Sequence, residues 1–558
     1  MNAVDTIAYQ AREEKKIFRQ QQQQMMPHNN NSRHSLPGSV RKRVVCLALL
    51  SRLMIMIGMM VSDATIPNHN PGNDVVRFPL AHHNDMCFCR AGYACDEEWR
   101  NYRLPTLETT TTTTMTQQCA APPPTDPQRR RPTKEWYRWI LHPWTRWDAA
   151  RFLHLAVDPW RRFPFSNNDE TDPFVVSEEA HAFFPLFPWL VRQTALWLVR
   201  LVPALFLPST FQGVAVLAAV LVNQTAFVVA ALALTDLTWT MVQHERATIL
   251  VATLFCGNPA GVFFSAAYSE STFAAWTFAG HAVFGRGLAI PAVLLWMAAS
   301  YTRSNGSLTA AWLLLAGLSK ILHTPCTVQR AKHTVGYLTM AILVALPVFL
   351  HDRVGYNIHC SGEYAPPPDW CGRQGGGISS LYSYVQAKRW NVGFLRYYQL
   401  RQIPNFLLAS PILVVSGMAV ASWIAQSWRA HEQDCARMDS KKEKSTKSTK
   451  NLFAQLWQWA VTALKQAGSD QHEKSVLGSH LLPHYAVLGV VALVGLTIAH
   501  VQISTRLICS TCPAVYWYLA SIFLREDQAM PTGRAVTLYC LLFNVLGIIL
   551  HPNWLPWT

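Results

Sequence analysis

Long apolar stretches with almost no charged residues are the feature that most constrains the fold of this chain. The first stretch, 44–62, has Arg52 as its one charge. Further stretches follow at 186–207, 211–234, 247–267, 271–302, 308–322, 335–350, 405–425, 480–500, 507–524 and 535–550. A helix needs ~20 apolar residues to cross a bilayer, and it satisfies every backbone amide within its own segment. The sequence therefore predicts an all-α polytopic membrane protein with about 8–11 transmembrane helices, in which 271–302 is one span or two.

The distribution of charge supports this class. Only 15% of the 558 residues are charged, against ~25% in an average soluble domain. The formal net charge of +15 comes largely from tails and loops, including the run KKEKSTKSTK at 441–450. No basic element interleaved with aromatic residues indicates nucleic-acid recognition. Positive charge beside a span instead predicts the cytoplasmic side of a membrane.

Counting spans from the basic segments gives a predicted map of the chain. Residues before 352 divide into 1–43, a disordered cytoplasmic tail; 44–62, the first span; 63–184, a luminal loop; and 185–351, further spans. Residues from 352 divide into 352–403, a luminal loop; 404–425, a span; 426–478, a basic cytoplasmic loop; and 479–558, spans with a luminal C-terminal segment. Within the first luminal loop, 85–135 is a low-complexity insertion and 136–184 is a tryptophan-rich segment. Tryptophan concentrates at membrane interfaces, so we expect short helices along the luminal surface there.

Thirteen cysteines give few clear signals. Cys360 and Cys371 flank a polar loop and either pair in an oxidising lumen or stay free. Cys87, Cys89 and Cys95 lack a convincing fourth ligand at zinc spacing, and no metal site is predicted. We expect none of the three sequons, at Asn30, Asn223 and Asn305, to be glycosylated, because the first is predicted cytoplasmic and the others lie in or against apolar runs.

The stretch HPWTRWDAARFLHLA, 142–156, places Asp148 next to Trp147 among aromatic residues. One interpretation is a helix cap, because Thr145 lies three residues before the acid as in a capping box. The other is a general base at the membrane surface, which must be ionised and within ~3 Å of the proton it removes. A helix start favours the ionised carboxylate, so the two interpretations are compatible.

Six motifs in order give the chain a recognisable pattern: WDA, FFPLFP, NPA followed by FFSAAYSES, RWNVGFLRYYQ, QIPNFLLASPI and LPWT. As a set they resemble the GPI mannosyltransferase 2 family, endoplasmic-reticulum membrane enzymes of the GT-C class. The resemblance covers approximately 136–157, 180–285, 300–310, 379–425 and 480–558. It implies a GT-C-like bundle and transfer of the second mannose from dolichyl-phosphate mannose to a GPI precursor through an α-1,6 link, with inversion.

The resemblance also implies roles for single residues. Asp148 matches the family's aspartate in the first luminal loop and would be the base, with no cofactor beyond the lipid donor. Trp147 would shape the sugar pocket, or else anchor the segment in the interface. The leaving phosphate needs positive charge; the candidates are Arg146, Arg396, Arg401 and Arg506.

Three further residues are candidates from their position. Glu270 is an intramembrane carboxylate and so a functional candidate by default, although Arg286 or His281 would serve to neutralise it. Asn258 and Pro259 would set a turn near the site. The expected partners are the two lipid-linked sugars and membrane lipids. A small accessory membrane subunit is compatible with the resemblance.

The chain departs from the family pattern at several places, including a long polar segment before AFFP, the 85–135 insertion and a shortened 318–337. Two rival functions use the same features: a transporter or scramblase for lipid-linked sugars, and a non-catalytic subunit of a transferase complex. Transporters commonly contain repeated halves, and no convincing repeat is visible. A soluble nucleotide-sugar transferase is disfavoured, because the sequence has no D-x-D motif and no βαβ pattern.

Overall fold

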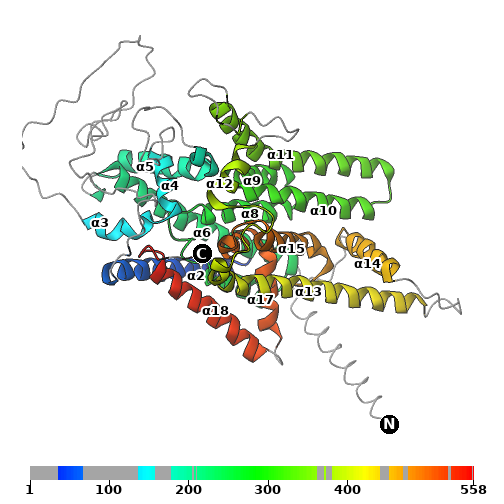
Figure 1. The fold of residues 1–558 in the computed structure, drawn as a ribbon. Helices are drawn as coiled ribbons and strands as arrows, with labels where there is room; N and C mark the ends of the chain where they lie inside the picture. The colour runs from blue at the N-terminus through cyan, green and yellow to red at the C-terminus, as the bar shows by residue number, and fades with distance from the viewer. Residues whose placement is uncertain are drawn as a thin grey trace, which may run out of the picture. The chain divides into compact units, whose positions relative to one another are not determined.

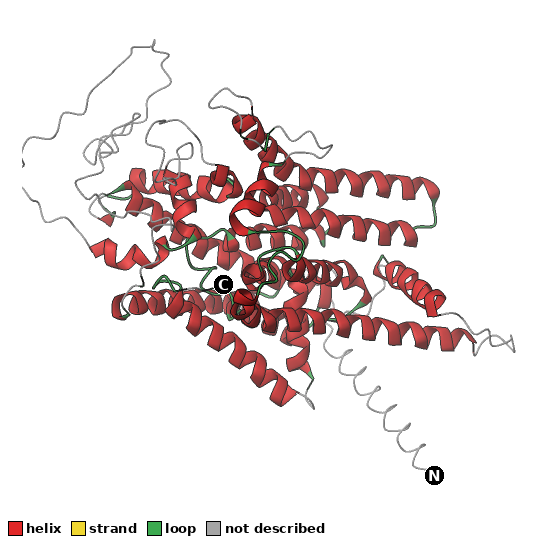
Figure 2. Ribbon diagram, viewed as in Figure 1, coloured by secondary structure: helices red, strands yellow, loops and turns green. Residues whose placement is uncertain are grey.

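The computed structural model describes residues 36–66, 69, 136–157, 178–203, 206–208, 210–360, 368, 370, 371, 380–439, 452–468, 475–525, 529–555 and 557. Throughout these residues the only regular elements are helices joined by turns and loops (Figures 1 and 2). The predicted 1–35 part of the tail, the 85–135 insertion with Cys87, Cys89 and Cys95, and the lysine run at 441–450 lie outside the described residues.

The α-helices fall into long apolar ones and short ones that sit between them. The long ones are α2 (Gly38–Thr65), α6 (Phe211–Val242), α11 (Thr327–Cys360), α13 (Ile403–Asp439) and α18 (Ala529–Leu550). Those of middle length are α5 (Leu186–Leu201), α8 (Glu270–Phe284), α9 (Ala289–Thr302), α10 (Leu308–His323), α14 (Leu452–Ala467) and α15 (Leu482–Thr497). The shorter ones are α3 (Trp136–Leu141), α4 (Asp148–Val157), α7 (Glu245–Cys256), α12 (Leu381–Trp390), α16 (Ser504–Thr511) and α17 (Pro513–Leu524). Short 3₁₀ turns include η3 (His142–Thr145), η4 (Glu178–Ala182), η6 (Ser304–Ser307) and η7 (Leu400–Gln402).

Seven helices among the described residues are long and apolar enough to cross a membrane, or eight if the bent pair Val501–Thr511 and Pro513–Leu524 forms one span. Eight is the lower end of the predicted range, and seven lies just below it. The interpretation of 247–267 as one continuous span was wrong, because α7 ends at Cys256 after 12 residues and the chain unwinds. The stretch 271–302 forms two shorter helices, which is one of the two predicted alternatives, with a turn at Gly287, whose φ of 82° suits glycine.

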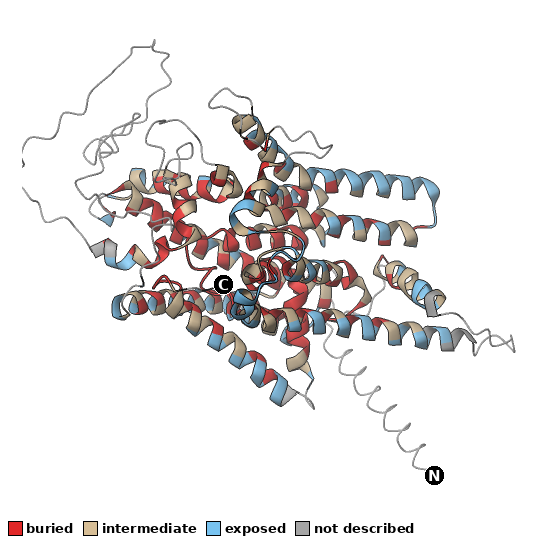
Figure 3. Cartoon of the chain, viewed as in Figure 1, coloured by how far each residue is buried: buried red, intermediate tan, exposed pale blue. Residues whose placement is uncertain are grey.

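The outward faces of the long helices are apolar. Of the 18 most apolar consecutive residues in each helix, 11% are buried in α11 and 28% in α13, whereas 61% are buried in α6. Figure 3 shows the same contrast, with buried residues gathered around α6, α8 and α17 and exposed residues along α11 and α13. A pattern of exposed leucine, valine and isoleucine on long helices is that of a surface facing lipid rather than water.

The unwound segment 257–269 is enclosed by side chains from several helices. Arg52 of α2 donates to the carbonyl oxygens of Gly261 (2.7 Å) and Cys256 (3.0 Å). Asn223 of α6 donates to Ala266 and Tyr268, and Asn544 of α18 to Asn258 (2.9 Å). Irregular backbone at membrane depth is tolerated only where protein satisfies its polar groups. The lone charge of the first span therefore has a structural use.

Side-chain contacts gather the predicted luminal segments together. Asp63 at the end of α2 pairs with Arg146, whose guanidinium also reaches the carbonyl of Pro552 after α18 (2.8 Å). Asn305 contacts Thr511 (2.9 Å), and His480 contacts the carbonyl of Met241 near the end of α6 (3.2 Å). The predicted map assigned no side of the membrane to Asn305 or Met241. The contacts of Arg146 therefore join segments predicted to be luminal, while which side is luminal stays a prediction.

Candidate active site

Asp148 is the first residue of α4, where its carboxylate lies near the positive end of the helix. Its backbone N–H donates to the phenol oxygen of Tyr268 (3.2 Å) at the end of the unwound segment. The predicted capping box is wrong: the hydroxyl of Thr145 donates to the carbonyl of His142 (2.8 Å) instead. The reason is that 142–145 form the separate 3₁₀ turn η3, so Thr145 belongs to a different element from α4.

Each oxygen of the Asp148 carboxylate has a guanidinium partner. Arg506 of α16 contacts Oδ2 through both terminal nitrogens (3.2 and 3.3 Å), and Arg151 contacts Oδ1 (3.3 Å). Burial by itself would raise the pKa of Asp148, but Arg506 and Arg151 outweigh it and hold that pKa below its usual value of 3.8. The lowered pKa keeps the carboxylate ionised, and the side chain is 27% exposed and so remains accessible.

Glu270, the first residue of α8, is the second carboxylate of the site and is 0% exposed. Its Oε1 lies 2.6 Å from Arg303 and 3.6 Å from Arg506. Both neutralising partners expected from the sequence are wrong. Arg286 pairs with Asp236 of α6, and His281, about three turns along α8 from Glu270, packs against Trp312 (4.7 Å).

Arg506 therefore links two carboxylates. We call Asp148, Arg151, Glu270, Arg303 and Arg506 the Asp148 cluster. The guanidinium also lies over the rings of Phe263 (5.2 Å) and Tyr268 (5.5 Å), which restrict its position. A buried carboxylate is tolerated when it is paired and hydrogen-bonded, and the cluster supplies three guanidinium groups for two carboxylates.

The residues just before Asp148 point toward other neighbours. Arg146 is 4% exposed, lies 2.9 Å from Asp63 and stacks over the ring of Trp554 (5.0 Å). Trp147 has a left-handed backbone, with φ of 56°, and its ring is 5.4 Å from that of Trp554. The guanidinium of Arg146 is thus engaged by protein, and the indole of Trp147 packs on protein too.

The remaining predicted residues lie around the cluster. Asn258 closes a turn, donating to Phe255 (2.7 Å) and accepting from the amide of Ala260 (2.9 Å), and Pro259 lies within this turn. Both residues lie at the start of the unwound segment, which contains Tyr268 near its other end. Arg396 and Arg401 are exposed, and the Arg401 side chain donates to Gln399 (2.6 Å).

A ring contact joins that exposed turn to His500, which lies near the cluster. Tyr397, between the two arginines, is buried and its ring lies 3.9 Å from that of His500. Burial and the neighbouring charge of Arg506 lower the pKa of His500 to about 4, against the opposing charge of Asp148. His500 is therefore neutral at physiological pH and lies within the electrostatic reach of both members of the central pair.

Sequence reasoning missed Arg151, Arg303 and Tyr268. Arg151 follows Asp148 by one helical turn, a spacing at which side chains meet. Tyr268 stands in FFSAAYSES and Arg303 just before SNG, so both lie in or beside stretches that carried the resemblance. Their contacts with the cluster join residues more than 30 positions apart, and no spacing rule reaches that far.

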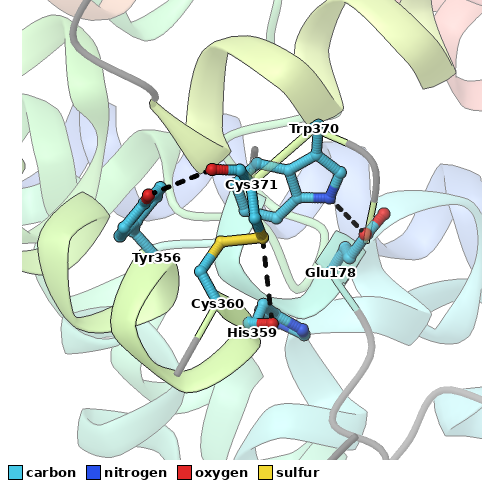
Figure 4. Close-up of a disulfide and its surroundings, with 6 residues drawn as sticks. All are labelled: Glu178, Tyr356, His359, Cys360, Trp370 and Cys371. Atoms are coloured by element: carbon cyan, nitrogen blue, oxygen red, sulfur yellow. Dashed lines mark hydrogen bonds between the residues drawn. A yellow bond between two sulfur atoms is a disulfide. The ribbon is translucent and has the colours of Figure 1, made fainter. Parts of the chain in front are cut away.

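A disulfide at the end of α11 lies beside residues that contact the 3₁₀ turn η4. Cys360 and Cys371 are paired, with Cα atoms 5.5 Å apart, which settles the alternative left open by the sequence. The neighbouring Trp370 donates to Glu178 (2.7 Å), as Figure 4 shows. The adjacent Glu179 lies 2.5 Å from Arg389 of α12 and 3.6 Å from Arg151. Arg151 thus connects this surface to Asp148.

The fold and this site define a class of protein: a multi-pass helical membrane enzyme with an accessible, ionised carboxylate and guanidinium groups beside it. A family model described as Mannosyltransferase (PIG-V) matches residues 141–558. The chain belongs to this family, and it is a mannosyltransferase. A transporter or a non-catalytic subunit is correspondingly disfavoured.

Named relatives agree with this assignment. GPI alpha-1,6-mannosyltransferase 2 of Cricetulus griseus is 28% identical over 476 residues, covering 74% of this chain and 87% of the relative. GPI mannosyltransferase 2 of Drosophila pseudoobscura pseudoobscura is 26% identical, covering 93% of this chain and 100% of the relative. GPI mannosyltransferase 2 of Schizosaccharomyces pombe is 26% identical, covering 75% and 74%. No solved structure matches the chain significantly.

Proposed function

We propose that this chain is the α-1,6-mannosyltransferase that adds the second mannose to a GPI precursor in the endoplasmic reticulum, with dolichyl-phosphate mannose as the donor. The observation that carries the proposal is the ionised, partly exposed carboxylate of Asp148 between two guanidinium groups, in a chain of the PIG-V mannosyltransferase family. The names of the relatives supply the acceptor and the linkage. Both substrates are lipids, which suits a site among membrane helices.

The proposed reaction is a single inverting displacement. Asp148 takes the proton of the acceptor hydroxyl while the hydroxyl oxygen attacks the anomeric carbon of the donor. The new bond joins that oxygen to the anomeric carbon, and the bond from the same carbon to the phosphate oxygen breaks. Dolichyl phosphate leaves with the electron pair, so a β-linked donor gives an α product. A carboxylate with a lowered pKa is ionised before the step, as a base must be.

Positive charge is needed where the phosphate gains negative charge. We assign this role first to Arg506, which lies beside both carboxylates, and to Arg303, whose Nη1 also donates to Ser269 (3.2 Å). Arg396 and Arg401 are exposed on the neighbouring turn and are proposed to attract the phosphate on its approach. Arg146 is less suited, because Asp63 and the Pro552 carbonyl already hold its guanidinium.

The membrane orientation is part of the proposal. The loop 63–184, which holds Asp148, and the C-terminal segment were placed in the lumen by counting from the basic segments, so the site would open to the lumen of the endoplasmic reticulum. A lipid-phosphate donor needs no metal–nucleotide pair, in keeping with the lack of a D-x-D motif in the sequence. A small accessory membrane subunit is compatible with this arrangement.

The test is transfer of radiolabelled mannose from dolichyl-phosphate mannose to a GPI precursor by membranes that contain the full-length chain. We expect Asp148→Asn to lower the rate by about 10²–10⁴-fold at unchanged protein amount, which is the range of general-base contributions. The matched control is Asp236→Asn, which also removes a carboxylate paired with an arginine, here Arg286.

The control is expected to keep its rate within about two-fold, since Asp236 contacts no member of the cluster through Arg286. Equal activity of Asp148→Asn and Asp236→Asn would overturn the base assignment. Transfer that is supported by a different sugar donor and not by dolichyl-phosphate mannose would overturn the donor assignment instead.

A further inference from the structure

Residues 551–554, His-Pro-Asn-Trp, form a short turn after α18 that the proposed chemistry leaves unused. His551, Asn553 and Trp554 are 1%, 0% and 5% exposed. The side chain of Asn553 donates to Ser62 of α2 (2.8 Å) and to the carbonyl of Ile549 (2.7 Å). Through Asn553 the turn is therefore joined both to α18 and to α2, although it has no regular structure.

This turn contacts the residue two positions before Asp148. Arg146 donates through Nε to the carbonyl of Pro552 (2.8 Å), and its guanidinium lies 5.0 Å from the ring centre of Trp554. Asp63 holds a terminal nitrogen of the same guanidinium (2.9 Å). Three groups from α2 and the turn thus fix one buried arginine, which fixes the backbone that enters α4.

The same turn contacts the residue immediately before Asp148. Trp147 and Trp554 both have left-handed backbones, with φ of 56° and 60°, and their rings lie 5.4 Å apart. A bulky side chain disfavours this conformation, which persists only where surrounding structure holds it. Because Asp148 follows Trp147 directly, relaxation of this residue to negative φ would redirect the start of α4.

A third contact comes from the other side of Asp148. The ring of His551 packs 5.7 Å from that of Tyr268, whose hydroxyl accepts the N–H of Asp148 (3.2 Å). Burial, together with the nearby charges of Arg146 and Arg506 and against that of Asp148, lowers the pKa of His551 to about 3. The imidazole is therefore neutral and adds no charge beside the carboxylate.

We propose that the turn 551–554 is a positioning element for the base, with Trp554 as its main positioning residue: it holds Trp147 in the left-handed conformation that aims Asp148. The inference rests on the proposed role of Asp148. It makes Trp554 act through another residue, without contact with the substrates. A purely structural tryptophan would affect the amount of folded protein, whereas a positioning residue affects the rate of the folded protein.

The experiment compares Trp554→Ala with Trp423→Ala in the mannose-transfer assay with full-length chain. Trp423 is the matched control, being 6% exposed, stacked on Tyr485 and bonded to the Gly478 carbonyl (3.1 Å), with no contact to the cluster through these partners. We expect Trp554→Ala to lower kcat by about ten- to hundred-fold, with the KM of each lipid within about three-fold, because small misplacements of a reacting group are costly. Trp423→Ala is expected to lose folded protein but to keep its kcat per folded molecule.

The decisive readout is a double-mutant cycle with Asp148→Asn. If Trp554 acts by aiming the carboxylate, Trp554→Ala changes the residual rate of the Asp148→Asn chain by less than about two-fold, since coupled residues are not additive. The proposal would be overturned if Trp554→Ala lowered the rate of the Asp148→Asn chain as much as it lowers that of wild type. An unchanged kcat in the single variant Trp554→Ala would overturn it too. If Asp148→Asn alone keeps full activity, the proposed base fails instead, and the two failures are distinct.

A milder variant keeps the test available if Trp554→Ala does not accumulate. Trp554→Phe retains an aromatic ring over Arg146 and shortens the contact surface with Trp147. It is expected to lower kcat by about two- to ten-fold, again only when Asp148 is present. The same change of kcat in both backgrounds would overturn the positioning role.

Discussion

Two groups of buried polar side chains in this protein differ in one respect that separates chemistry from packing. The Asp148 cluster holds two carboxylates among three guanidinium groups, and Asp148 itself is 27% exposed. The second group, which we call the His281 cluster, holds His281 and His484 with rings 4.8 Å apart, enclosed by Trp296, Trp312 and Trp517. Both histidines are at most 5% exposed, and the rings around them carry no charge.

The difference has a physical reason. Charges are costly to bury, so a cluster of five charged side chains is kept only where paired and, in an enzyme, where one member reaches its substrate. Neutral imidazoles among indole rings lose little by burial and fill space between α8, α10, α15 and α17. The comparison predicts that changes in the first cluster alter catalysis and stability together or catalysis alone, while conservative changes in the second alter neither strongly.

The largest effect is expected at Glu270, which is fully buried between Arg303 and Arg506. Glu270→Gln leaves two guanidinium groups with one carboxylate fewer, and breaking a buried pair from one side costs about 3–5 kcal/mol. We expect a large drop in folded protein in a thermal-unfolding assay in detergent, and loss of mannose transfer by what remains. Stability equal to that of wild type would show that Glu270 is not ionised in the fold, and would place the cluster's charge on Asp148 alone.

The Glu270 case also shows how far the sequence reaches. Glu270 was predicted to be a functional candidate because a charge is conspicuous in an apolar stretch. Its predicted partners were Arg286 or His281, the nearby basic residues on the same stretch. The actual partners, Arg303 and Arg506, lie 33 and 236 positions away, and only the folded bundle brings them to the start of α8.

Other features divide in the same way. Motif order and the counting of spans identified Asp148 and Arg506 as candidate site residues, and the structure places the two side chains in contact. The unwinding after Cys256 could not be predicted from hydropathy, because the stretch stays apolar while its carbonyls are satisfied by Arg52, Asn223 and Asn544 from three other helices. Local pattern predicts elements well when they satisfy themselves, and poorly when distant side chains satisfy them.

A smaller effect is expected on the pH dependence of transfer. Arg151 lies 3.3 Å from Asp148 and helps to lower its pKa, so loss of this positive charge favours the protonated, inactive form. Activity falls as the pH drops through the pKa of the base. Arg151→Gln therefore raises that pKa and moves the acid side of the pH profile toward higher pH. The activity at pH 4.5 divided by the activity at pH 7 is expected to be about two-fold lower than in wild type.

Arg151→Lys is the matched control for this measurement, because it keeps a positive charge near Oδ1 while losing the guanidinium geometry. Its ratio of activities at the two pH values should stay close to that of wild type. A shift of the Arg151→Gln profile toward lower pH has the wrong sign for a carboxylate base and would remove Asp148 from that role.

The smallest effect is expected in the His281 cluster. The Nε2 atom of His484 is buried with no hydrogen-bond partner in the described structure, and replacing an unpartnered polar group by an apolar one of similar size is nearly neutral. We expect His484→Leu to change the free energy of unfolding by less than about 1.5 kcal/mol and to keep mannose transfer within about two-fold. His484→Asp, which places a carboxylate among the indole rings, should instead remove most of the folded protein. A ten-fold fall in kcat for a well-folded His484→Leu chain would contradict the division between the two clusters, because it would make a neutral, enclosed imidazole part of the chemistry that Asp148 performs.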